Sequence, residues 1–190
     1  MAEPLYRPRS LPEEYLAFER QSTERHEYLD GEIVAMSGGT REHSLLASRL
    51  ILELGTALRD RPCEVHGSDL RIKIEAARSY TYADVVVVCG EPAFDDRQRD
   101  TLVNPQLIVE ILSDSTESYD RGEKFAHYRT LSTLTDYLLV AQKKPLIEHY
   151  RRQPGGAWLL TAYGPGQSVP LASLACELAV DEIYRRFFPS

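Results

Sequence analysis

Two short apolar stretches, YADVVVV at residues 82–88 and LIVEIL at residues 107–112, decide the fold that we expect for this chain. Runs of this length that are rich in β-branched residues are typical of central strands, which are covered on both faces. Each stretch contains one acid, Asp84 in the first and Glu110 in the second. Because an unpaired carboxylate costs several kcal/mol to bury, both acids need a partner.

A cation held between two neighbouring strands would meet that need. Oxygen ligands without a cluster of histidines and cysteines favour Mg²⁺ or Mn²⁺ over Zn²⁺. The alternative is that each acid lies at a strand end, where it pairs with an arginine or caps a backbone group. From these two positions alone, a metal site and a pair of structural acids are equally good interpretations.

The rest of the chain alternates strands with helices. Apolar residues at helical spacing predict helices at residues 11–27, 42–59, 121–131 and 181–188. Strands are expected at residues 32–36, 65–68, 70–75 and 136–141, and a hairpin at residues 146–151 and 158–163. This order predicts an α/β fold with a mixed β-sheet flanked by helices, followed by a C-terminal hairpin and helix.

The length and charge of the chain limit the classes of function. A chain of 190 residues fits a single domain. Its formal net charge of -7 argues against a protein that coats nucleic acid through bulk electrostatics. An enzyme that handles phosphodiesters at one local site stays compatible with this charge, because carboxylates that bind a metal are themselves acidic.

The sequence also indicates a location. Its N-terminus lacks the apolar core of a signal peptide, and no stretch approaches the roughly 20 apolar residues that span a bilayer. The cysteines Cys63, Cys89 and Cys176 are odd in number and form no Cys-x-x-Cys pair. We therefore expect neither a zinc site nor a disulfide, and a cytoplasmic protein without membrane contact.

Three further residues are candidates for the same site as the two acids. Lys124 begins the helix expected after Glu110, where an amine can orient or deprotonate water and stabilise charge on a phosphate. Glu32 opens the first strand, just before a Gly-rich turn, and His43 lies early in the next helix. Taken alone, each of the three is more often a solvated surface residue.

From residue 28 to about residue 151, the chain resembles the Uma-two family of endonucleases, within the PD-(D/E)XK nuclease superfamily. The resemblance rests on the order and spacing of five segments: YLDGEIVAMSGGTREHS (28–44), YADVVVV (82–88), NPQLIVEILSDST (104–116), YDRGEKFAHYR (119–129) and DYLLVA (136–141). It implies a restriction-endonuclease-like core over about residues 28–151, within a single nuclease-like domain of residues 1–190.

This resemblance also implies roles for individual residues. Asp84 matches the acid of the superfamily's Pro-Asp position, and Glu110 matches the acid of its (Asp/Glu)-x-Lys position, so both would bind Mg²⁺ or Mn²⁺. Lys124 would position the attacking water or its base, and Glu32 and His43 would lie beside the metal. The implied activity is metal-dependent hydrolysis of phosphodiester bonds, in DNA rather than RNA.

The chain departs from the superfamily pattern at three places. Ala83 replaces the proline before Asp84, which leaves the metal-binding carboxylate in place. Leu112 stands where the superfamily has its lysine, and Lys124 on the following helix matches the place to which the lysine of this family has moved. Ala141 ends DYLLVA where many members have an acid, so any role of that acid is absent here.

Other functions stay open at this point. The chief alternative is a binding or regulatory module that keeps the fold without turnover, which the net charge and the lack of a basic stripe favour. A phosphoesterase for small nucleotides and a structural subunit with salt-bridged acids are further alternatives. Apolar side chains near the C-terminus and around Trp158 predict a symmetric homodimer: Ile183, Tyr184, Phe187 and Phe188.

Overall fold

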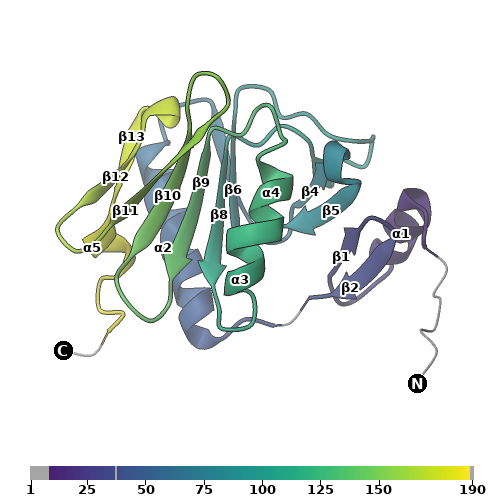
Figure 1. Ribbon diagram of the computed structural model, residues 1–190, viewed down its shortest axis with the longest axis horizontal. Helices are drawn as coiled ribbons and strands as arrows, with labels where there is room; N and C mark the ends of the chain where they lie inside the picture. Colours follow the sequence, from purple (N-terminus) through teal and green to yellow (C-terminus); the bar gives the residue numbers. More distant parts are fainter. Residues whose placement is uncertain (1–8, 37, 189–190) are drawn as a thin grey trace.

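The computed structural model describes residues 9–36 and 38–188, and within them the chain forms three β-sheets with flanking helices (Figure 1). The central sheet is mixed and contains, in order, β11 (Trp158–Tyr163), β10 (Ile147–Arg152), β9 (Asp136–Ala141), β8 (Leu107–Leu112), β6 (Val85–Cys89) and β3 (Cys63–Gly67). The N-terminal sheet contains, in order, β2 (Glu32–Ala35), β1 (His26–Leu29), β5 (Ser79–Tyr82), β4 (Arg71–Ile74) and β7 (Thr101–Leu102). The third sheet is the hairpin of β12 (Ser168–Leu171) and β13 (Cys176–Ala179).

Helices cover both faces of the central sheet. Figure 1 shows α2 (Arg41–Ala57) behind the sheet, and α3 (Glu117–Tyr119) and α4 (Phe125–Tyr128) in front of it. A π-helical turn at Asp120–Lys124 joins α3 to α4, and this segment connects the parallel strands β8 and β9. The other helices are α1 (Pro12–Glu19) and α5 (Val180–Ile183).

The strands β6 and β8 separate two apolar cores. Val85, Val87 and Val109 face α2, and they pack in one cluster with its leucines and with the β12–β13 hairpin. Val86 and Ile108 face the other way, into a cluster that contains Tyr128 of α4 and apolar residues of the N-terminal sheet. Because residues alternate between the faces of a strand, both runs are apolar throughout. The prediction of two buried central strands is confirmed.

The helix expected at residues 11–27 is too long. It ends at Glu19, and residues 26–29 instead form β1, which pairs with β2. The two-residue turn between these strands, Asp30-Gly31, has φ angles of 44° and 100°. This is the left-handed conformation that a tight hairpin of type I′ requires, and it fixes the strands in antiparallel register.

Two other elements differ from their predictions. The run YADVVVV is divided between two strands, because the chain leaves the N-terminal sheet after β5 and enters the central sheet at β6. Ala83 and Asp84 occupy the crossing. The helix expected at residues 181–188 covers only Val180–Ile183, and the left-handed φ of 53° at Arg186 is incompatible with its continuation.

The expectation that no disulfide forms is wrong. Cys63 on β3 lies directly opposite Cys89 on β6, and the two sulfur atoms are bonded. Their sequence separation of 26 residues gives no local signal, because strand pairing alone brings them together. Cys176 is a free thiol. The cysteines thus give no support for a reducing compartment, and the cytoplasmic location stays a prediction; no helix in the described part of the chain is long and apolar enough to cross a membrane.

The aromatic surface that was expected to favour a dimer is largely packed inside the chain. Ile183 and Tyr184 are buried, and Trp158 packs edge-to-face on Phe125 of α4. The apolar side chains that do face solvent here are Leu159 and Leu160, which are 46% and 47% exposed. Both lie on β11, one of the two edge strands of the central sheet.

The buried position of Ile108 gives a direct test of the central strands. Ile108→Ala should lower the free energy of unfolding by about 2–5 kcal/mol, because it removes buried methyl groups and leaves a cavity in the core. Chemical denaturation measures this change. The control Leu52→Ala alters a residue of α2 that is 62% exposed and should change stability by less than about 0.5 kcal/mol. A loss below about 1 kcal/mol for Ile108→Ala would contradict a central position for β8.

Candidate active site

A cleft of about 1070 Å³ opens at the end of the central sheet, where this sheet meets the N-terminal sheet and the start of α2. Its polar lining includes six titratable side chains from five parts of the chain: β1, the β5–β6 crossing, α2, β8 and the π-helical turn. These side chains are Glu27, Asp84, His43, Glu110, Asp120 and Lys124. A cleft that gathers titratable groups from so many elements is a candidate active site.

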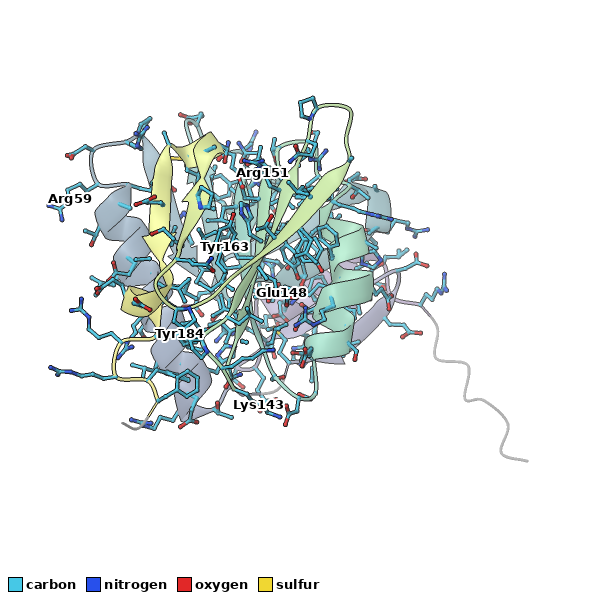
Figure 2. The ribbon with its side chains drawn as sticks, turned by 60° about the vertical axis from the view of Figure 1, so that its left-hand side comes forward. Arg59, Lys143, Glu148, Arg151, Tyr163 and Tyr184 are labelled. Carbon is cyan, nitrogen blue, oxygen red and sulfur yellow. A yellow bond between two sulfur atoms is a disulfide. The ribbon has the colours of Figure 1, made fainter. Side chains whose placement is uncertain are left out.

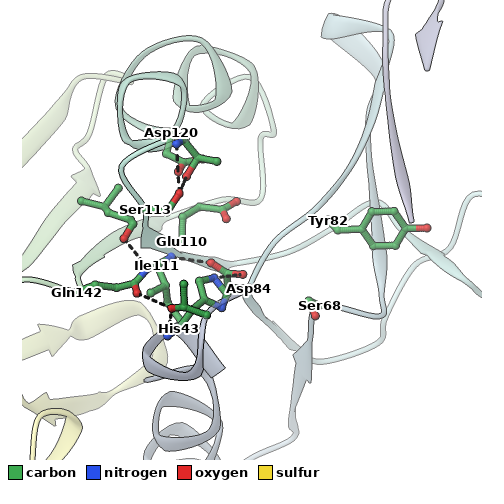
Figure 3. A network of polar contacts seen from close by, with 12 residues as sticks. His43, Ser68, Tyr82, Asp84, Glu110, Ile111, Ser113, Asp120 and Gln142 are labelled. Atoms are coloured by element: carbon green, nitrogen blue, oxygen red, sulfur yellow. Dashed lines mark hydrogen bonds and ion pairs between the residues drawn. The ribbon is translucent and has the colours of Figure 1, made fainter. Parts of the chain in front are cut away.

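Asp84 stands at this end of the sheet because the chain crosses between sheets there. Its Oδ1 lies 3.0 Å from Nε2 of His43, and its Oδ2 accepts a hydrogen bond of 2.7 Å from the backbone N–H of Ile111. The pairing of Val85 with Val109, continued by one residue, sets Asp84 opposite Glu110. Figure 3 shows Glu110 and Asp84 near the end of β8, with Asp84 joined to His43 and to the backbone of Ile111.

Glu110 is the buried acid of the site, with 3% of its surface exposed. Its Oε1 accepts a hydrogen bond of 2.8 Å from the hydroxyl of Tyr128 and lies 3.0 Å from Nζ of Lys124. The two partners come from α4 and the π-helical turn, which pack on the same face of β8. Sequence analysis did not single out Tyr128 as a site residue.

Lys124 is also buried, and it lies among several acids. Besides Glu110, its Nζ lies 3.5 Å from Oε1 of Glu27 and 3.9 Å from Oδ1 of Asp120. It also donates to the backbone carbonyl of Tyr82 at 3.3 Å. The π-helical turn contributes both Lys124 and Asp120, and such turns are rare and frequent at functional sites.

The site holds more negative than positive charge. Burial raises the pKa of Glu110 well above its ordinary value, and the charges of Asp84 and Asp120 raise it further against the opposing effect of Lys124. Burial likewise raises the pKa of Asp120. Burial alone would lower the pKa of Lys124, but Glu110, Glu27 and Asp120 outweigh it and raise this pKa. Such a cluster favours the uptake of a proton or of another cation.

The structure brings together four of the five predicted site residues, namely Asp84, Glu110, Lys124 and His43. It does not bring Glu32 to the cleft, because this residue is exposed at the start of the edge strand β2. Glu27 on the neighbouring strand β1 is the N-terminal acid that reaches Lys124. Sequence analysis missed it because residues 11–27 were assigned to a helix.

The donor set of the cleft fits a hard divalent cation. Its acids present carboxylate oxygens, the ligands that Mg²⁺ and Mn²⁺ prefer. Among the described residues, however, no group of three or more acidic, histidine or cysteine side chains is already arranged to hold a metal ion. Glu110 already contacts Lys124 and Tyr128, so its carboxylate oxygens would have to bind the ion in addition to these two partners.

The family model of Uma2, described as "Putative restriction endonuclease", matches residues 12–181 of this chain. The chain belongs to the Uma2 family. This match covers all three sheets, the cleft and every residue of the site. The resemblance of the sequence to this family is confirmed.

Two relatives by sequence and one solved structure are similar to this chain over most of its length. The Synechocystis sp. (strain PCC 6803) protein "Uncharacterized protein slr1290" is 42% identical over 178 residues, which cover 94% of this chain and 93% of that protein. A second protein of this organism, "Uncharacterized protein sll1609", is 40% identical over 148 residues, 78% of this chain and 84% of that protein. A solved structure from Anabaena variabilis, titled as a putative nuclease belonging to DUF820, superposes with a TM-score of 0.76 at 16% identity, over 94% of this chain and all of that chain. That structure shows that the α/β nuclease fold is shared.

The contact between His43 and Asp84 predicts a pH dependence. The hydrogen bond to Asp84 raises the pKa of His43 above its ordinary value against the effect of burial. The pair should therefore stabilise the fold fully below the unfolded pKa of about 6.5, and this contribution should be lost as the pH rises through the folded pKa. Asp84→Asn should lower the pKa of His43, as measured by NMR titration of the imidazole. An unchanged His43 titration in this variant, with the other imidazoles as internal controls, would contradict the contact.

Proposed function

We propose that this chain is a metal-dependent endonuclease that hydrolyses phosphodiester bonds in DNA. One observation carries the proposal: the pairing of β6 with β8, continued by one residue, sets Asp84 opposite Glu110, both line the cleft, and the amine of Lys124 lies 3.0 Å from Glu110. The description of the Uma2 family and the nuclease fold of the solved structure support a nuclease. The requirement for a metal and the choice of DNA are our own inferences.

Asp84 and Glu110 are the residues that would hold Mg²⁺ or Mn²⁺. When bound there, a divalent cation supplies Lewis acidity and neutralises charge on the scissile phosphate. The protein contributes orientation: His43 and the N–H of Ile111 each fix one oxygen of Asp84, and Tyr128 fixes Glu110. Such fixed partners hold ligands in one geometry before the substrate arrives.

Lys124 is the cation that the protein itself supplies at the reacting phosphate. Its side chain is 9% exposed, so its charge is weakly screened and acts strongly on a group that enters the cleft. An ammonium placed there can orient the attacking water and stabilise the negative charge that develops on the phosphate.

Cations at the rim of the cleft offer contacts for the DNA backbone. Thr40 and Gln142 both line the cleft and are joined by a hydrogen bond of 3.2 Å, and the next residues along the chain are Arg41 and Lys143. The side chains of Arg41 and Lys143 are 82% and 77% exposed, and their ion pairs with Glu42 and Asp114 lie at the surface. Lys143 extends from the lower edge of the molecule in Figure 2. Exposed pairs of this kind are weak, so a phosphate can replace the carboxylate.

A binding module without turnover is the second candidate. The observation that favours it is that Glu110 is already engaged by Lys124 and Tyr128, with no three-ligand group preformed in the described part of the chain. The two candidates differ in whether cation binding is followed by cleavage.

The decisive experiment uses Asp84→Asn, which keeps the size of the side chain and removes one negative charge. If the acids serve to bind a metal, Mg²⁺ should raise the melting temperature of the wild type and not that of the variant. Plasmid nicking should be lost. At a pH above the folded pKa of His43, where the His43–Asp84 pair no longer contributes, the metal-free variant should be no less stable, because repulsion between acids is relieved. The exposed acid Asp60 gives the control Asp60→Asn, which should behave as wild type.

The outcomes separate the candidates. A destabilised Asp84→Asn variant, with melting temperatures of both proteins indifferent to Mg²⁺, would mean that Asp84 is a structural acid and would exclude the nuclease. A wild type that Mg²⁺ stabilises but that nicks no nucleic acid would favour the binding module.

A homodimer would suit the cutting of both strands of a duplex, and β11 is the edge that we expect to pair. This strand, WLLTAY, contains no charged residue, and unprotected edge strands readily pair with another chain. Light scattering at tens of micromolar should give a dimeric mass for the wild type and a monomeric mass for Leu160→Lys. Leu52→Lys, which changes an exposed leucine on α2, is the control that should stay dimeric. A monomeric wild type would contradict this assembly.

A further inference from the structure

The N-terminal sheet contributes one buried acid to the cleft, Glu27. The residue is 9% exposed, and its Oε1 lies 3.5 Å from Nζ of Lys124. None of the roles implied by the family resemblance falls on it, and the proposed reaction does not use it directly. A buried carboxylate at this place needs an explanation, because burial without a purpose would only destabilise the fold.

The contacts of Lys124 show what Glu27 can do. An ammonium has three N–H donors, and three acceptors from three different strands surround this one. They are Glu110 of β8 at 3.0 Å, the carbonyl of Tyr82 of β5 at 3.3 Å and Glu27 of β1 at 3.5 Å. Each acceptor pulls the amine in a different direction, so its position depends on all three.

Glu27 is itself held firmly. Its Oε1 accepts hydrogen bonds from the hydroxyl of Thr81 and, at 3.4 Å, from the backbone N–H of Tyr82. These two residues end β5 immediately before the crossing that presents Asp84. The same carboxylate therefore fixes the lysine and the backbone that leads to the first metal-binding acid.

We propose that Glu27 is the positioning residue for Lys124: it holds the amine beside Glu110 without letting Glu110 become its sole counter-ion. An ammonium paired with Glu110 alone would compete with a metal ion for that carboxylate. With Glu27 sharing the charge of the lysine, Glu110 keeps the capacity to bind a cation. The expected effect of Glu27 on catalysis rests on the proposed function. Its expected effect on cation affinity requires only that the cleft binds a cation.

The test compares Glu27→Gln with Glu19→Gln. Glu19 is a matched control, because it is a buried acid of the same region that accepts hydrogen bonds of 2.9 Å from the N–H of His26 and the hydroxyl of Tyr82, outside the cleft. Both variants keep an oxygen acceptor and lose one charge. Three quantities are measured for each: Mn²⁺ affinity by calorimetry, the melting temperature, and kcat and KM for plasmid nicking, with each protein assayed at the same interval below its own melting temperature.

Glu27→Gln should lower kcat by at least about tenfold with little change in KM, since it alters the reacting centre and not the contacts with the DNA. It should weaken Mn²⁺ binding several-fold and should not lower the melting temperature as much as Glu19→Gln does. Glu19→Gln should leave kcat and Mn²⁺ affinity as in the wild type. Glu27→Asp, which keeps the charge, should recover part of both losses.

Failure of this inference and failure of the proposed function are distinguishable. Wild-type kcat and Mn²⁺ affinity in Glu27→Gln would overturn the role of Glu27 and leave the nuclease standing. The role of Glu27 would also be overturned if Glu27→Gln and Glu19→Gln both lost kcat and Mn²⁺ affinity in proportion to the fall in their melting temperatures. Mn²⁺ affinity that falls in Glu27→Gln alone, in a protein that cleaves no nucleic acid, would leave Glu27 at a cation site and overturn the nuclease. A wild type that neither binds Mn²⁺ nor cleaves would overturn both.

Discussion

The rest of the site depends on the contacts that the buried ammonium of Lys124 makes with its acceptors. This ammonium links β8 of the central sheet to β5 and β1 of the N-terminal sheet. Breaking a buried ion pair by removing one partner costs about 3–5 kcal/mol, because the other charge is left without compensation. The lysine is therefore a structural requirement of the cleft as well as a candidate for its chemistry, and the two roles have to be separated by variants that keep the lysine in place.

The acids of the site could be predicted because each is a single charged residue within an apolar run. Asp84 and Glu110 each interrupt a run of β-branched residues, and such an anomaly is visible without any knowledge of the fold. The central strands, the hairpin of β10 and β11, and the long helix α2 follow from apolar periodicity in the same way. Lys124 and His43 needed the family resemblance, because a lysine or histidine on a helix is most often a solvated residue.

The features that sequence analysis missed depend on contacts between distant segments. The partner of Cys63 is set by the register of β3 on β6, and no spacing within the sequence reports that register. Glu27 and Glu32 are five residues apart on paired strands, and only the position of β1 against β5 decides which of the two reaches the cleft. The apolar run at residues 82–88 gave no sign that it serves two sheets.

The charge of the cleft connects the fold to the proposed reaction. A cluster of acids with raised pKa values destabilises a folded protein near neutral pH, because the folded state must either take up protons or accept repulsion. The pKa values of Glu110 and Asp120 are both raised, and the opposing effect of Lys124 is too small to cancel this. An ion pair that served stability alone would be expected to balance its charges. The imbalance, located where Asp84 and Glu110 line a cleft, is the observation on which our proposal of a bound cation rests.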